Sequence, residues 1–118
     1  MSIPEAPEGA GPAGARLWRA VLAEFELAEH ELTLLRQAVR VADLCEQLQA
    51  IVEEDGPMLT VDGQPSTHPA VVELRQQRIM LARLIVALRV PLGDQEDEQA
   101  TRPQRRALRG VYAIGDAG

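Results

Sequence analysis

Two long apolar runs, Glu31 to Glu54 and Pro69 to Val90, most constrain how this chain folds. A short connection rich in Gly, Pro and Asp separates them. Their helical periodicity predicts two antiparallel helices that form a hairpin. Each run is apolar over a wider arc than one helix covers on the other. We therefore expect an all-α fold whose hairpin oligomerises through its wide apolar faces.

Apolar residues recur at spacings of three and four along both runs, which is the pattern of a coiled-coil seam. In the first run, further apolar residues flank this seam. In the second run, the apolar residues form one stripe, which is expected to face the first helix. We expect these residues to lie in an interface between copies of the chain. The predicted oligomer-interface residues are Leu34, Val41, Cys45, Leu48, Val52, Leu74, Leu81, Ile85 and Leu88.

The connection between the two runs carries helix-stop and turn signals. Asp-Gly-Pro at 55–57 ends the first helix, because Gly suits the left-handed C-terminal position and Pro cannot extend a helix. Asp-Gly at 62–63 is typical of a type I′ turn between two short extended pieces. Pro69 fits the first turn of the next helix, with Thr67 or His68 as its cap. We expect an ordered loop or a small β-hairpin here.

A shorter amphipathic helix precedes the hairpin. Its apolar residues at spacings of three and four are Trp18, Val21, Leu22 and Phe25. Glu29 and Glu31 suit the first turn of a new helix, where the helix dipole favours negative charge, so we predict a break near Leu27 to Ala28. The alternative is one continuous helix of roughly 58 Å, because the heptad pattern continues across this point.

The domain organisation follows from composition. Residues 1–14 are rich in Pro and Gly and are expected to be a disordered leader. Residues 15–91 form the predicted helical oligomerisation core. Residues 92–118 combine an acidic block with a basic block without an apolar periodicity, and we interpret them as a mobile charged tail.

The sequence contains few residue patterns that carry chemistry. It has no phosphate-binding glycine loop and no nucleophile elbow, and Cys45 is its only cysteine. Glu26 and His30 are spaced to share a helical face, but a metal or catalytic site would need Cys45 or His68 to join them. We expect no enzyme activity, no cofactor and no metal site.

The net charge of −6 repels nucleic acid on average, so DNA contact requires a local basic segment. The arginines between residues 102 and 109 form such a segment, which can bind phosphates without base readout. The alternative interpretation is that these arginines belong to a solvated tail and are balanced by the acidic residues that precede them. Arg16 and Arg19 form a second, weaker candidate at the entrance of the core. The predicted DNA-binding residues are Arg102, Arg105, Arg106, Arg109, Arg16 and Arg19.

The first fifteen residues lack the basic and apolar regions of a signal peptide, and no apolar run approaches the roughly 20 residues of a membrane span. A cytoplasmic protein without membrane contact is expected.

Residues 16–91 resemble the small terminase subunits of tailed bacteriophages and prophages. The resemblance is carried by Leu17-Trp18, Phe25-Glu-Leu, the run ELTLLRQAVRVADLCEQL, the loop DGQPSTHP and the run VVELRQQRIMLARLIVALRVP. Its more specific parts are the entry at His68-Pro69 and the exit at Leu81, Leu84, Leu88 and Pro91.

This resemblance implies a non-catalytic protein that forms a ring, recognises double-stranded viral DNA and brings it to the large terminase subunit in the bacterial host cytoplasm. Many members carry an N-terminal helix-turn-helix, which residues 1–15 are too short and too rich in Gly and Pro to form. The arginine-rich tail would then supply the DNA contact. The alternative function is a dimeric helical adaptor that binds a protein partner.

Overall fold

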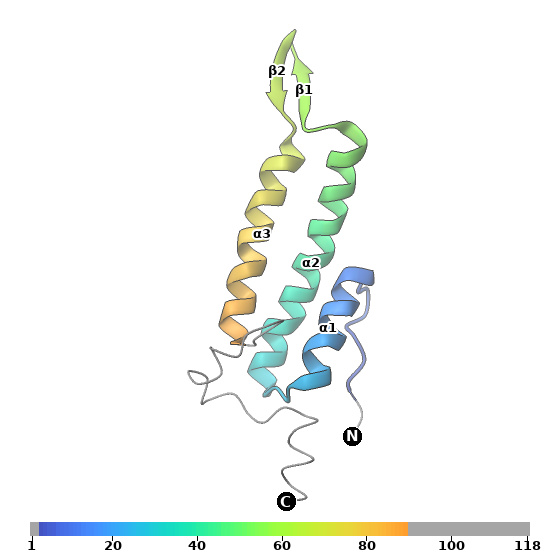
Figure 1. The fold of residues 1–118 in the computed structure, drawn as a ribbon, viewed down its shortest axis with the longest axis vertical. Coiled ribbons are helices and arrows are strands. Elements are labelled where there is room, and N and C mark those ends of the chain that lie inside the picture. Colours follow the sequence, from blue (N-terminus) through green and yellow to red (C-terminus); the bar gives the residue numbers. More distant parts are fainter. Residues whose placement is uncertain (1–2, 90–118) are drawn as a thin grey trace, which may run out of the picture.

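The computed structural model describes residues 3–89 and contains three helices and one β-hairpin. Along the chain, the elements are α1 (Pro12–Glu24), α2 (Glu29–Asp55), β1 (Met58–Val61), β2 (Gln64–Thr67) and α3 (Pro69–Leu88). Helices α2 and α3 run antiparallel, the β-hairpin projects beyond their shared end, and α1 packs against the N-terminal half of α2 (Figure 1). The predicted helical hairpin with a small β-hairpin connection is confirmed.

The predicted break between the first two helices is also confirmed. Helix α1 ends at Glu24, and Phe25 has an extended backbone. Helix α2 begins at Glu29 after the extended Ala28. The Glu31 carboxylate accepts a hydrogen bond from the Ala28 amide at 2.7 Å and thereby satisfies one of the free amides at this helix start. A single continuous helix is therefore wrong.

The expectation of a disordered leader over residues 1–14 is wrong for its last part. Helix α1 begins at Pro12, a first-turn proline, so residues 12–14 are helical. The segment before it also contacts the core, since Ala6 and Ala10 pack there. The Trp18 indole N–H donates to the Pro4 carbonyl at 2.7 Å. Residues 92–118, interpreted above as a mobile tail, lie outside the described residues.

Asp43 of α2 caps the start of α1. Its carboxylate accepts hydrogen bonds from the amides of Gly11 and Gly14, each at 2.7 Å. A helix start leaves such amides unpaired, and here a residue of another helix satisfies them. A Cβ on Gly14 would lie 2.6 Å from Val39 Cγ1 and 2.7 Å from the Val39 carbonyl oxygen. Only glycine allows α1 to approach α2 this closely.

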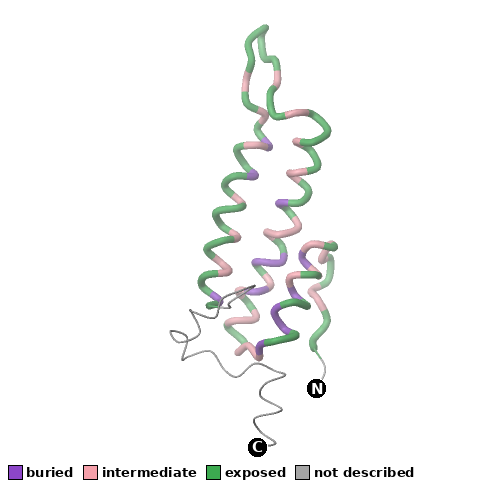
Figure 2. Tube along the Cα trace, viewed as in Figure 1, coloured by how far each residue is buried: buried purple, intermediate pink, exposed green. Residues whose placement is uncertain are grey.

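The core lies where α1 meets the hairpin. Its buried apolar residues come from all three helices and are Trp18, Val21, Leu22 and Phe25 of α1 and its end, Leu35 and Val39 of α2, and Leu88 of α3. Figure 2 shows that buried positions gather at this end, whereas most of the opposite end of the hairpin is exposed. The part of the hairpin beyond α1 is only two helices thick.

The β-hairpin has the register Val61 opposite Gln64 and Met58 opposite Thr67. Asp62 and Gly63 both have positive φ, 52° and 79°, as a type I′ turn requires. The turn predicted from the Asp-Gly pair is thus present.

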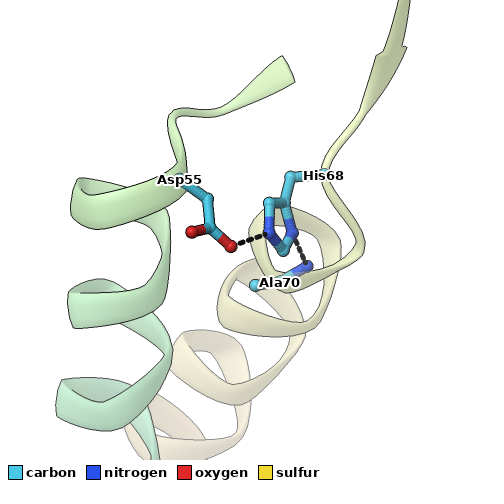
Figure 3. Close-up of polar contacts among 3 residues, drawn as sticks. All are labelled: Asp55, His68 and Ala70. Atoms are coloured by element: carbon cyan, nitrogen blue, oxygen red, sulfur yellow. Dashed lines mark hydrogen bonds and ion pairs between the residues drawn. The ribbon is translucent and has the colours of Figure 1, made fainter. Parts of the chain in front are cut away.

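His68 fastens the start of α3 to the end of α2. Its Nδ1 accepts a hydrogen bond from the Ala70 amide at 3.0 Å, and its Nε2 lies 2.9 Å from Asp55 Oδ2 (Figure 3). Because Nδ1 is an acceptor, the ring proton sits on Nε2 and is donated to the carboxylate. Of the two caps that the sequence allowed, the structure uses His68 and not Thr67.

Replacing Asp43 by Ala is expected to lower the free energy of unfolding by about 1–3 kcal/mol, because two partly buried amides lose their acceptor. Urea unfolding followed by circular dichroism measures the loss. Glu46→Ala, an exposed carboxylate on the same helix, is the matched control and should change stability by less than about 0.5 kcal/mol. Equal losses in the two variants would contradict the capping role of Asp43.

Candidate assembly surface

Three of the nine residues predicted to join copies of the chain pack within one chain. Cys45, Leu74 and Leu88 are buried, so they fill the hairpin's own interior and are closed to another copy. For these three residues the burial comes from the same chain. The remaining six predicted interface residues are half-buried: Leu34, Val41, Leu48, Val52, Leu81 and Ile85.

Helix α3 carries a second apolar stripe that the sequence interpretation missed. Val72, Ile79 and Val86 are 42%, 46% and 74% exposed and are spaced seven residues apart. Two helical turns separate successive members, so all three lie on one line along the helix. Each member precedes one of Leu74, Leu81 and Leu88 by two residues, which places it about 200° around the helix. We call Val72, Ile79 and Val86 the outer stripe.

A groove runs beside the outer stripe. One hollow of about 550 Å³ lies between the two hairpin helices, lined by Val52 and Pro57 on one side and by Val71, Leu74, Ile79 and Ala82 on the other. A second hollow of about 340 Å³ is lined by Ile79, Ala82, Arg83 and Val86. The two hollows share Ile79 and Ala82, so they form one apolar groove along α3, which we call the α3 groove.

Arginines surround the α3 groove. Arg75 and Arg78 line the first hollow and Arg83 the second. The Arg78 guanidinium donates a hydrogen bond to Gln49 Oε1 at 2.7 Å, which ties it to α2. Arg75 and Arg83 have no ion-pair partner within residues 3–89. Two positive charges are therefore available beside the exposed apolar stripe.

Helix α2 presents a similar pattern with the opposite charge. Leu44 and Ile51 are 36% and 43% exposed and are again seven residues apart. The segment Glu29–Asp55 contains seven acidic residues and two arginines, a net charge of −5, whereas Pro69–Leu88 contains one acid and three arginines, a net charge of +2. We call Leu44 and Ile51 the α2 pair.

The Cys45 thiol lies in the hairpin interior. Burial raises the pKa of the thiol, while Arg78 lowers it and Glu46 raises it to a smaller extent. Because only a thiolate is a strong nucleophile or metal ligand, this environment disfavours both roles.

The weak catalytic candidate proposed from the sequence loses its geometry. Glu26 lies in the extended segment between α1 and α2, and His30 lies inside α2, so they do not share a helical face. Within residues 3–89, no group of three or more His, Cys, Asp or Glu side chains is placed to hold a metal ion. No helix in the same range is long and apolar enough to cross a membrane.

The predicted DNA-binding residues fall into two sets. Arg16 and Arg19 are exposed on α1, three residues apart and so on neighbouring parts of its surface. Arg102, Arg105, Arg106 and Arg109 lie outside the described residues.

Comparison with protein-family models, curated proteins and solved structures finds no match for this chain.

Proposed function

We propose that this protein is a non-catalytic terminase small subunit of a tailed phage or prophage. In this role it assembles as a ring, recognises double-stranded viral DNA and recruits or regulates the large terminase subunit for genome packaging. The proposal rests on the sequence resemblance over residues 16–91 and on one structural observation, the outer stripe of α3. That stripe supports self-assembly, and the DNA and large-subunit roles come from the resemblance.

The outer stripe favours association because its apolar surface is in contact with water. Burying a Val or Ile side chain contributes roughly 1.5–3 kcal/mol when the burial is complete, and less for these half-exposed residues. The α3 groove extends the same apolar surface. A continuous exposed apolar surface of this kind is typical of a protein–protein contact.

The small core points in the same direction. The buried apolar residues of the described chain gather where α1 covers the hairpin, and the far half of α2 and α3 buries few side chains. Domains of this size bury a low fraction of their surface, and oligomerisation is a common remedy. Contacts between copies along the hairpin would stabilise the part that α1 does not cover.

A dimeric adaptor remains the competing function, since the α3 groove is also suited to a single partner helix. The two functions differ in the number of subunits. A two-fold dimer satisfies the adaptor, whereas a ring requires every copy to contact two neighbours.

Native mass spectrometry of the full chain at low micromolar concentration tests the proposal. We expect a single species of about eight to twelve subunits, the range that the family resemblance implies for a closed cyclic assembly. A monomer or dimer that persists on raising the concentration would contradict the terminase proposal and favour the adaptor.

The proposed DNA contact is tested by truncating the chain after Gly93, which removes Arg102 to Arg109. We expect weaker binding to duplex DNA and a smaller salt dependence, because four phosphate contacts give a slope of about −3.6 in log K against log salt. A filter-binding or fluorescence titration at several salt concentrations measures both. An unchanged affinity and slope would contradict this assignment, and Arg16→Ala with Arg19→Ala would then test the α1 candidate.

A further inference from the structure

We propose that the outer stripe of α3 in one copy packs against the α2 pair of a second copy. The contact is then head-to-tail, between two different faces, and not a two-fold contact of one face with itself. This inference rests on the proposed self-association and names the surfaces that carry it. Three features of the described residues favour a second copy as the occupant: matched height, shape and charge.

The two faces match in height along the hairpin. Asp55 of α2 bonds His68 at 2.9 Å, which fixes the antiparallel alignment of the helices. Counting from this bond at the same rise per residue, Ile51 lies level with Val72, and Leu44 lies level with Ile79. A second copy placed alongside in the same orientation therefore brings two apolar residues of α2 to two apolar residues of α3.

The α3 groove offers a hollow that can receive side chains of the second copy. Its two hollows, about 550 and 340 Å³, meet at Ile79 and Ala82 in the middle of the helix. Small Ala82 leaves room beside the branched Ile79, so a large side chain of a neighbouring helix can enter. Leu44 and Ile51 are exposed large side chains at the same spacing as the stripe that borders the groove.

Charge distinguishes the possible pairings. A two-fold contact between outer stripes would gather Arg75 and Arg83 from both copies, four positive charges without an ion-pair partner in the described chain. Like charges at short range repel, most of all where water is excluded. A contact with the α2 pair does not gather these charges: Glu54 follows Ile51 by three residues on that face of α2, and Arg40 precedes Leu44 by four.

In a pair of copies joined head-to-tail, one copy still has a free α2 face and the other still has a free α3 face. Such an interface therefore continues until it closes as a ring or grows as a filament. A variant damaged on one face keeps the other face intact. Two variants damaged on different faces should then form one contact with each other and no more.

The test uses the full-length variants Ile79→Glu and Ile51→Arg. The first places a negative charge on the outer stripe, and the second places a positive charge level with Val72, less than one helical turn from Arg75. We expect each variant alone to be a monomer by native mass spectrometry. An equimolar mixture, with one variant isotopically labelled, should give a one-to-one heterodimer and no larger species.

Met80→Glu is the matched control, since Met80 is 44% exposed on α3 but lies about 100° around the helix from Ile79. It should assemble like the wild type, and circular dichroism checks that all variants keep their helices. If the wild type assembles but the mixture stays monomeric, or Ile51→Arg alone still assembles, the pairing of the outer stripe with the α2 pair is wrong and self-association stands. A monomeric wild type would overturn both this inference and the proposed function.

Discussion

The contact between α1 and α2 determines which surfaces of this protein remain available. Asp43 holds the first turn of α1 through the amides of Gly11 and Gly14, and Gly14 lets the two helices touch at Val39. Because α1 occupies this side of α2, α3 packs on another side and closes the core with Leu88. The face of α3 that carries the outer stripe is left uncovered by either helix.

The same arrangement makes the hairpin uneven. The end near α1 has a core built from three helices. Towards the β-hairpin, α2 and α3 are held together by the buried side chains of Cys45, Ala70 and Leu74 and by the hydrogen bond between His68 and Asp55. A two-helix layer buries one side of each helix and leaves the other in water. Within residues 3–89, apolar residues on those outer sides, of which Ile51 and Ile79 are examples, are left exposed. This exposed apolar surface is the physical basis of the proposed assembly.

Local signals in the sequence were sufficient for the elements of the fold. The Asp-Gly pair at 62–63 predicted the turn, and Glu31 marked the start of α2 because its effect is confined to one helical turn. Local signals could not predict that the start of α1 is ordered. Its start depends on Asp43, which lies 29 residues beyond Gly14 in the chain. Composition alone could only suggest disorder for a segment so rich in Gly and Pro.

Part of the predicted interface lies inside the hairpin. A heptad seam indicates that a helix face is buried, but it does not say whether the partner belongs to the same chain. Leu74 and Leu88 therefore looked like interface residues and proved to be the hairpin's interior. The outer stripe has the same seven-residue spacing, and only the packing of α3 on α2 shows which of its two stripes is left exposed.

Chemical cross-linking between α2 and α3 tests the central claim, that these faces meet between copies, most directly. In a chain with Cys45→Ser, cysteines are introduced at Leu44 and Ile79, which the head-to-tail contact brings together, and a short bis-maleimide is added. The account predicts a ladder of covalent multimers up to the full assembly from the chain that carries both cysteines, and no multimers from either cysteine alone. A covalent dimer from the Ile79→Cys chain alone, or no ladder from the double-cysteine chain, would contradict it.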